Sequence, residues 1–255
     1  MAKMDFGPIA DDYAFFMTHS TEAECGAVAY ADELVEFRLR ESIRMLDFGC
    51  GGGEFTERLL ALLPWRPEKF ALTLVEPVES HAEQAAERLG RFSQASITHQ
   101  RGLPVGDGRY DLVLANHALY FVSAMEPTMA RLFELLSPDG LMLLGIAGWD
   151  NALVQFWRRG FDELGQSVPY YVAEDVEAAL TQLDARFTIR DVPYQIRFLN
   201  LRENRERIIR FLFGEYFDKL SPASIGGWFA PYVVGDHIHI ETHCWHFAVG
   251  PSGEA

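Results

Sequence analysis

The pattern of apolar and polar positions changes twice along the chain. Over residues 10–40, apolar side chains recur every three to four positions, which predicts helix, and Ser20 or Thr21 is the candidate N-cap. From residue 43, short continuous apolar runs alternate with helical periods. The runs predict strands at 43–48, 70–76, 96–100, 110–117 and 141–148, and the periods predict helices at 54–63, 78–90, 124–136 and 149–164.

The last third of the chain has a different pattern. It predicts a strand at 186–196, a helix at 204–220 and a long final strand at 236–249. Apolar strands that alternate with helices are typical of a parallel sheet covered on both faces. Because the final strand follows a helical segment, we expect it to pair antiparallel at the edge of this sheet.

Composition narrows the possible functions. The chain has 255 residues, 49% of them apolar, which is enough for one domain with its own core, and its net charge of −15 argues against nucleic acid as a partner. Three unevenly spaced cysteines favour a reducing compartment. The N-terminus lacks the apolar stretch of a signal peptide, and no apolar run reaches membrane-spanning length. We therefore expect a cytoplasmic protein with no membrane partner.

The stretch "RMLDFGCGGGEF" at 44–55 joins a predicted strand to a predicted helix. A P-loop would need a lysine after the glycines, and a dinucleotide fingerprint would need a third glycine where Glu54 stands. An acid at a helix N-terminus is unfavourable next to a pyrophosphate. The pattern suits a nucleoside-like ligand that is cationic and carries no phosphate, and S-adenosylmethionine (AdoMet) is such a ligand.

Other polar residues follow the predicted strands and fit the same ligand. Asp47 and Glu54 are placed to attract its cationic groups, and Glu76 to accept its ribose hydroxyls, although dinucleotide enzymes place an acid similarly and a plain helix N-terminal acid is the alternative. The candidate cofactor-binding residues are Asp47, Gly49, Cys50, Gly51, Glu54, Glu76, Pro77, His81, Gly102, Leu103 and Asn116.

This order of parts over residues 44–147 resembles a class I AdoMet-dependent methyltransferase. The resemblance implies a Rossmann-like α/β fold, with a mostly parallel seven-stranded sheet, helices on both faces and an antiparallel last strand. The family often holds the adenine amino group with an acid after the third strand. Asp107 is too far along the chain for that role, so we expect the backbone at Gly102 and Leu103 to hold adenine.

Three further stretches, "THSTEAEC", "LYFV" and "AGWDNALVQFWRR", resemble the histamine N-methyltransferase-like family. The resemblance implies that Glu22 binds the amine of the acceptor and that His117 contacts it at a position where an amide is known in the family. It also implies a polar contact from the last strand, where His243 is the best match within one or two residues. Tyr13, Phe16 and Tyr120 are candidate acceptor-binding aromatics, with packing in the core as the alternative.

The final strand carries several histidines. His237, His239, Glu241 and His243 share one face of it, because alternate residues of a strand point the same way. A zinc pair is one interpretation of H-x-H, but these side chains are more typical of a solvated edge, and no metal is expected.

These observations predict one domain over 1–255. It comprises a helical cap at 1–40, a cofactor-binding half at 41–148 and an acceptor-side half at 149–255, with a helical insertion at about 195–235. The predicted activity is methyl transfer from AdoMet to a nitrogen of a small amine or imidazole, in a monomer or homodimer, with His117 or His243 as the base. An O- or carboxyl-methyltransferase, a non-catalytic AdoMet binder and a nicotinamide-dependent reductase remain alternatives.

Overall fold

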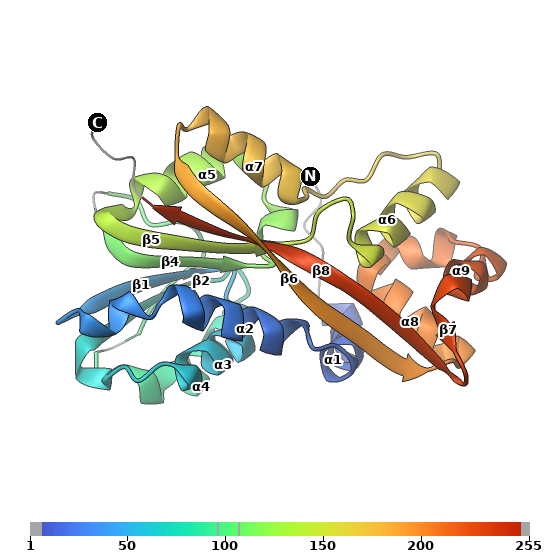
Figure 1. The fold of residues 1–255 in the computed structure, drawn as a ribbon, viewed down its shortest axis with the longest axis horizontal. Coiled ribbons are helices and arrows are strands. Elements are labelled where there is room, and N and C mark those ends of the chain that lie inside the picture. The colour runs from blue at the N-terminus through green and yellow to red at the C-terminus, as the bar shows by residue number, and fades with distance from the viewer. Residues whose placement is uncertain (1–6, 96, 107, 251–255) are drawn as a thin grey trace.

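One twisted sheet runs through the centre of the protein, and helices cover both of its faces (Figure 1). This computed structural model describes residues 7–95, 97–106 and 108–250. Seven strands follow each other across the sheet in the order β3-β2-β1-β4-β5-β8-β6, and a short β7 pairs with β8 beside this path. The strands are β1 Ile43–Phe48, β2 Phe70–Val75, β3 Thr98–Gln100, β4 Tyr110–Asn116, β5 Leu136–Ile146, β6 Arg186–Leu199, β7 Val233–Val234 and β8 His237–Gly250.

The Rossmann-like α/β fold with a mainly parallel sheet is confirmed. Strands β1 to β5 pair in parallel, and β8 pairs antiparallel with both β5 and β6. The expectation that the last strand lies at the edge is wrong, because β8 lies between β5 and β6. The reason is burial: Ile238, Ile240 and Phe247 of β8 are fully buried and need neighbours on both sides, whereas the first half of β6 is largely exposed.

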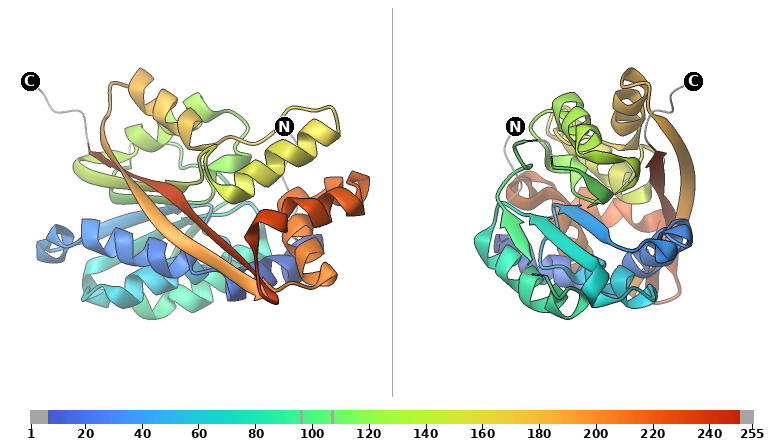
Figure 2. Two further views of the ribbon diagram at one scale, coloured as in Figure 1. Left: turned by 45° about the vertical axis from the view of Figure 1, so that its right-hand side comes forward. Right: turned by 90° about the vertical axis from the view of Figure 1, so that its left-hand side faces the viewer.

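Each face of the sheet packs against its own set of helices (Figure 2). Consecutive residues of β1 show this division, since Leu46 packs in one apolar cluster and Met45 in the other. One cluster contains residues of α5, α6, α7 and α8, and the other contains residues of α2, α3 and α4. The helices are α1 Ala10–His19, α2 Glu22–Glu33, α3 Glu54–Leu62, α4 Glu79–Leu89, α5 Met125–Glu134, α6 Ala152–Glu163, α7 Ala173–Gln182, α8 Arg202–Phe213 and α9 Pro222–Trp228.

The predicted helical cap is divided where the N-cap was expected. Ser20 forms a β-bridge with Ile196, and the backbone N–H of Thr21 donates to the Gln195 carbonyl over 2.9 Å. Thr21 is the N-cap residue of α2 but its side chain does not cap the helix, whereas the Ser20 hydroxyl accepts from the Glu22 N–H. Pairing with β6 therefore ends α1 and fixes the first residue of α2, Glu22. The first six residues of the cap, and residue 96 of a predicted strand, lie outside the described part of the chain.

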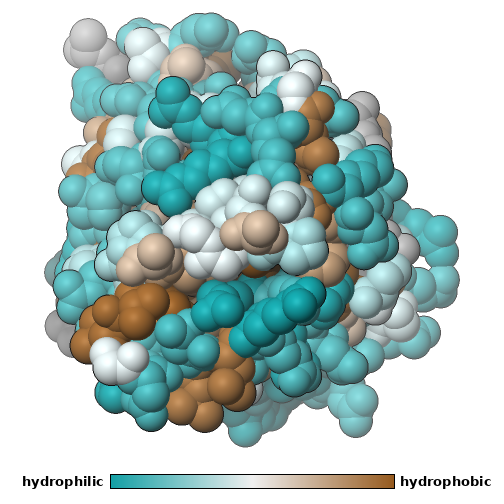
Figure 3. All heavy atoms as spheres, turned by 90° about the vertical axis from the view of Figure 1, so that its right-hand side faces the viewer, coloured by the Kyte–Doolittle hydropathy of each residue, from teal (hydrophilic) through white to brown (hydrophobic). Residues whose placement is uncertain are grey.

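The end of the molecule opposite the parallel strands is built by α1, α8, α9 and β7, and β6 and β8 extend to it (Figure 1). Asp12 of α1 is buried and accepts from Arg210 of α8 at 3.0 Å, with Arg207 at 3.5 Å, so these two helices are joined by charge. Figure 3 shows apolar and polar surface alternating on this end. The exposed apolar residues near it are Leu199, Leu201, Val233 and Val234.

Two boundaries differ from the sequence prediction. The helices of the insertion begin at Arg202, not near 195, because β6 stays paired with β8 up to Leu199. Helix α7 was not predicted from the sequence. It begins after Val172, where the Asp175 carboxylate accepts from the Val172 N–H. Among the helices described, none is both long and apolar enough to span a membrane.

Candidate functional site

The glycine turn lies at the carboxyl end of β1 and leads directly into α3. Gly49 has φ +71°, and a Cβ built on it would lie 2.4 Å from the Ala118 Cβ, so only glycine lets the segment after β4 approach this closely. Gly51 also has a positive φ, of +53°, but a Cβ there would meet nothing within 4 Å. The turn therefore packs against the β4 segment at one glycine and faces open space at another.

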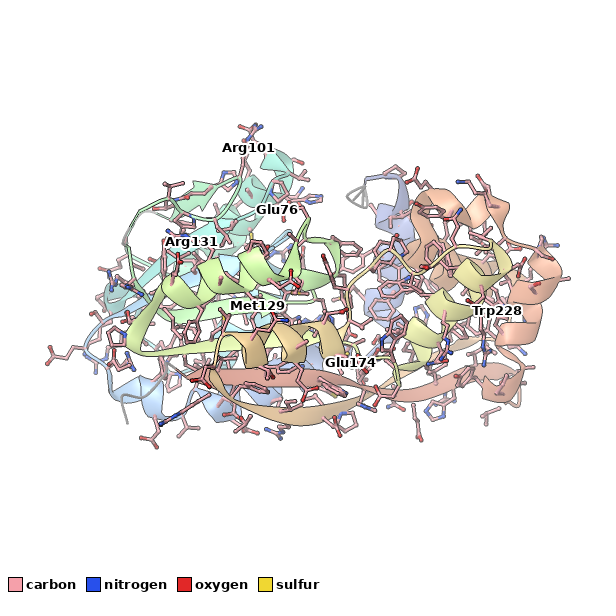
Figure 4. The ribbon with its side chains drawn as sticks, turned by 90° about the horizontal axis from the view of Figure 1, so that it is seen from above. Glu76, Arg101, Met129, Arg131, Glu174 and Trp228 are labelled. Atoms are coloured by element: carbon pink, nitrogen blue, oxygen red, sulfur yellow. The ribbon has the colours of Figure 1, made fainter. Side chains whose placement is uncertain are left out.

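Two carboxylates flank this turn from neighbouring strands. Asp47, the fifth residue of β1, is buried and accepts from the Thr56 hydroxyl. Burial raises the pKa of Asp47 to about 7, the Thr56 hydrogen bond opposes this rise, and the nearby Glu76 adds to it. Glu76 follows β2 and accepts from the backbone N–H groups of Gly51 at 3.2 Å and Val78 at 2.9 Å. Figure 4 labels Glu76 in the half of the molecule built by β1 to β5, far from Trp228 at the other end.

The third expected acid of the turn, Glu54, lies in a different environment. Its side chain is about half exposed and pairs with Arg88 of α4 at 2.8 Å, with the ring of Tyr13 close enough for its charge to help raise the pKa of that phenol. The Cys50 thiol donates to the Gly51 carbonyl, and burial, together with the nearby acids, raises its pKa. Of the acids flanking the turn, Asp47 and Glu76 are thus the ones without an ion pair to any residue that the structure describes.

Asn116 ends β4 beside the turn. Its side-chain oxygen is buried, and no residue in the described part of the chain donates to it. A buried acceptor without a donor is costly to a fold and is commonly retained for a ligand. Open space at Gly51, the two carboxylates Asp47 and Glu76, and the Asn116 oxygen together fit a cationic, phosphate-free nucleoside such as AdoMet. When bound, AdoMet would be held by these residues.

The remaining cofactor candidates lie around the same edge of the sheet. Pro77 is exposed after β2, and His81 is half-buried in the first turns of α4. Gly102 is exposed and Leu103 half-buried after β3, where Arg131 of α5 donates to the neighbouring Pro104 carbonyl at 2.7 Å. Asp107, the acid judged too distant for adenine, is outside the described residues.

A second group of polar side chains lies next to this turn. It includes His117, which directly precedes Ala118, the residue that packs against Gly49. His117 has φ +54°, a conformation that non-glycine residues rarely adopt, and its N–H donates to the Gly145 carbonyl at 2.8 Å. Its Nε2 lies 3.6 Å from Glu22 Oε2, and the two side chains are 21% and 16% exposed. The structure thus brings Glu22 and His117 together, as expected.

The third side chain at this point is Cys244, which had no predicted role. Its Sγ lies 3.5 Å from Glu22 Oε1, in position to donate, and burial followed by the Glu22 charge raises the pKa of the thiol. His243 points to the other face of β8, where its Nε2 lies 3.0 Å from Asp150 and 3.9 Å from Asp191. The structure does not bring His243 to Glu22, because adjacent residues of a strand point to opposite faces.

The rest of the histidine face of β8 is paired locally. His237 Nδ1 lies 2.6 Å from Asp236, and His239 Nε2 lies 3.0 Å from Gln195 of β6 and 3.8 Å from Glu241. These rings are partly exposed on the outer face of the strand. Each has its own neighbours, as expected of a solvated face.

Hydrogen bonds support the Glu22 pair from both sides. Tyr120 is buried, and its oxygen accepts from the Ala147 N–H at 2.7 Å and lies 3.1 Å from His117 Nδ1. The Tyr120 oxygen is therefore the hydrogen-bond partner of both the Ala147 amide and the His117 ring, and the His117 Nε2 atom is left facing Glu22. On the other side, Tyr194 hydrogen bonds to Cys244 Sγ and accepts from Asn151. The His117 ring and the Cys244 thiol therefore face the Glu22 carboxylate from two directions.

Aromatic rings border this cluster. Phe16 is buried and stacks on Phe211 of α8 at 4.8 Å between centroids, and Tyr13 lies 5.5 Å from the same ring. Desolvation of the Tyr13 hydroxyl, followed by the charges of Glu22 and Glu54, raises the pKa of Tyr13, although the residue as a whole is 38% exposed. Tyr13 is therefore within range of both charges, whereas Phe16 and Tyr120 belong mainly to the core.

Comparison with known proteins agrees with this geometry. The family described as "Methyltransferase domain" matches residues 23–187. The malonyl-[acyl-carrier protein] O-methyltransferase of Geobacter sulfurreducens is 29% identical over 57% of this chain and 57% of its own, and the trans-aconitate 2-methyltransferase of Delftia acidovorans is 30% identical over 45% and 41%. The chain thus spans about half the length of the curated relatives it matches.

Solved structures share the fold at low sequence identity. The YcgJ protein from Bacillus subtilis has a TM-score of 0.58 at 15% identity and covers 88% of this chain and 98% of its own. A Thermotoga maritima protein described as a possible histamine N-methyltransferase has a TM-score of 0.54 at 16% identity and covers 97% of this chain and 98% of its own. The family match spans more than half of the chain and includes the glycine turn, both flanking acids and His117, and it begins one residue after Glu22. The chain therefore belongs to the methyltransferase domain family, and its cofactor is AdoMet.

Proposed function

We propose that this protein transfers a methyl group from AdoMet to a nitrogen of a small amine or imidazole compound. The observation that carries the proposal is the Glu22 carboxylate, which is 16% exposed and has the Cys244 thiol and the His117 imidazole around it. The glycine turn is next to this group, because Gly49 packs against Ala118, the residue after His117. A largely buried carboxylate attracts a cationic amine or accepts an N–H, and it repels an anionic acceptor.

Different residues of the proposed site bind AdoMet and the methyl acceptor. AdoMet, when bound, supplies a methyl group already activated by its sulfonium. Asp47 and Glu76 hold the cofactor, and Tyr13 limits the space over the acceptor. The main contribution of such a site is to align the acceptor and exclude water.

Glu22 takes the role of base in this proposal. His117 is held by Tyr120 at Nδ1 and lies 3.6 Å from Glu22 at Nε2, so in this proposal it orients the acceptor next to the carboxylate. A primary amine must lose a proton before it attacks, and the Glu22 carboxylate is the proposed acceptor of that proton. Of the two histidines expected from sequence, His117 is kept as an acceptor-binding residue, and His243 has no part.

A second candidate, O- or carboxyl-methyl transfer, has support from the relatives. The malonyl-[acyl-carrier protein] O-methyltransferase and the trans-aconitate 2-methyltransferase both carry names that describe other acceptors. Their similarity covers about half of this chain. Glu22 disfavours this candidate, because a carboxylate acceptor would meet a like charge at short range.

Two broader expectations are also part of the proposal. The three free cysteines, Cys25, Cys50 and Cys244, support a reducing, cytoplasmic location. The protein is proposed to act as a monomer or homodimer on a small molecule.

An acceptor screen tests the proposal. The protein is incubated with isotope-labelled AdoMet and matched panels of histidine derivatives, biogenic amines, phenols and dicarboxylates, and the labelled product is identified by mass spectrometry. We expect label on a nitrogen of an amine or imidazole. Label confined to phenols or carboxylates would support the second candidate instead, and no turnover with any class would contradict both.

A further inference from the structure

We propose that Glu22, His117 and Cys244 form a binding site for Zn²⁺ or a similar thiophilic divalent cation. One carboxylate oxygen, one imidazole nitrogen and the thiol sulfur lie within 4.8 Å of one another. Among the described residues, no other group of three histidine, cysteine or acidic side chains could hold a metal ion in this way. Nothing in the methyl-transfer chemistry requires a metal, so the site is an additional property of the cluster.

The separations within the cluster match a tetrahedral site. Bonds of about 2.0–2.3 Å from Zn²⁺ to oxygen, nitrogen and sulfur place neighbouring ligand atoms about 3.3–3.8 Å apart. Cys244 Sγ lies 3.5 Å from Glu22 Oε1, and His117 Nε2 lies 3.6 Å from Glu22 Oε2. Each Glu22 oxygen thus lies at ligand-to-ligand distance from one of the other two ligands, and the three ligand atoms lie within 4.8 Å of one another.

The hydrogen-bond partners of the proposed ligands are of the kind that orient ligands in metal sites. His117 Nδ1 lies 3.1 Å from the Tyr120 oxygen, which is the kind of partner that orients a ligating imidazole. Cys244 is hydrogen bonded to Tyr194, and Tyr194 to Asn151, so the sulfur is held in place from behind. The three ligands come from α2, the end of β4 and β8, and each is fixed by the fold before any metal arrives.

The ligand types select the cation. A thiolate and an imidazole favour Zn²⁺, Co²⁺ or Cd²⁺, whereas Mg²⁺ and Ca²⁺ prefer oxygen ligands. Three protein ligands leave a fourth position for water or another small ligand, as in zinc sites that are not purely structural. Glu22 and the Cys244 thiolate together balance the two positive charges of the ion.

Metal binding has a defined proton balance. The Cys244 S–H bond breaks and its proton goes to solvent, because the thiolate is the ligand. His117 binds the ion as the neutral ring with its proton on Nδ1, where the proton is donated to the Tyr120 oxygen, and the Nε2 lone pair is left for the ion. One proton is therefore released for each metal bound.

Cobalt absorption tests this directly. Co²⁺ is titrated into the whole protein under reducing, metal-free conditions, and thiolate-to-cobalt charge transfer is recorded together with the visible bands of four-coordinate Co²⁺. We expect one Co²⁺ per chain, displacement by Zn²⁺ but not by Mg²⁺, and release of one proton when Zn²⁺ titrations are repeated calorimetrically in buffers of different ionisation enthalpy. None of these measurements needs methyl transfer, so they stand apart from the identity of the acceptor.

Matched variants assign the band to the cluster. Cys244→Ser is expected to abolish the charge-transfer band, whereas Cys25→Ser, one turn along α2 from Glu22, is expected to keep it. Tyr120→Phe is expected to weaken Co²⁺ binding by about 10–100-fold while keeping the band, as loss of a partner behind a ligand does. If Cys244→Ser does not fold, Glu22→Gln replaces it, with weaker binding and a shifted visible spectrum expected.

Two results would overturn the proposal. One is a protein that binds Co²⁺ without any thiolate band or does not bind it at micromolar concentrations, in which case the cluster is a hydrogen-bonded group only. The other is a band that survives Cys244→Ser and disappears with Cys25→Ser.

Discussion

Cys244 Sγ lies 3.5 Å from Glu22 Oε1, and thereby the last long strand of the sheet contacts the first residue of α2. The two residues are 222 positions apart in the chain. Their contact forms one side of the proposed acceptor site, and His117 forms the other at 3.6 Å from the same carboxylate. Glu22 is therefore the residue on which the proposed function depends.

Gly49→Ala is expected to damage both the fold and cofactor binding. The new methyl group would lie 2.4 Å from the Ala118 Cβ, in a backbone conformation with positive φ. We expect a loss of about 1–3 kcal/mol in the free energy of unfolding and at least a tenfold weaker AdoMet dissociation constant. Denaturant unfolding and calorimetry with AdoMet measure the two effects.

Gly90→Ala is the control for that change. Gly90 has φ −55°, and a Cβ there meets nothing within 4 Å. We expect it to keep wild-type AdoMet binding and to leave stability unchanged or slightly raised. Equal losses in both variants would contradict the packing account of Gly49.

AdoMet binding is expected to tighten as pH rises through 7. Burial raises the pKa of Asp47 to about 7, so at lower pH its carboxyl is protonated and offers no charge to the cofactor. The dissociation constant should fall by up to about tenfold per pH unit below 7 and level off above it. Asp47→Asn is expected to bind weakly with a flat pH profile, measured by calorimetry.

The same carboxyl affects stability with the opposite sign. In the unfolded chain its pKa is near 3.8, so the folded state holds this proton more tightly. The stabilising contribution is complete below pH 3.8 and is lost as pH rises toward 7. Asp47→Asn should therefore be more stable than wild type at neutral pH in unfolding measurements without cofactor, and a less stable variant would contradict the buried-carboxyl interpretation.

Tyr120→Phe is expected to lower stability and turnover together. The Ala147 N–H and His117 Nδ1 would both lose their partner in a buried position. We expect a loss of about 1–3 kcal/mol in the free energy of unfolding and a lower kcat, because the His117 ring is no longer held in place by Tyr120. Tyr110→Phe, at a half-buried tyrosine of β4 outside the cluster, is the matched control and should change neither.

The parallel part of the fold could be predicted because strands buried on both faces leave continuous apolar runs. Met45 and Leu46 illustrate this, since each packs in a different cluster. The place of β8 could not be predicted, because pairing between β5 and β6 depends on residues far apart in sequence. Helix α7 was missed for a different reason: its first residues, "AEDVE", carry few apolar positions.

The candidate site was predicted in part for similar reasons. Glu22 and His117 were paired through a family resemblance, and the structure brings them together. His243 was chosen over Cys244 because sequence alone does not fix which residues of a long strand face inward. The register of β8 against β6, with His243 opposite Pro193 and Cys244 opposite Val192, sets that choice.

The most direct test of the account compares Glu22→Gln with wild type on an amine acceptor and its uncharged hydroxyl analogue. Gln keeps the size of the side chain and removes its charge. We expect the KM for the amine to rise at least tenfold, with the KM for the hydroxyl analogue and the dissociation constant for AdoMet unchanged. An unaltered KM for every amine acceptor would contradict the claim that Glu22 selects a nitrogen acceptor.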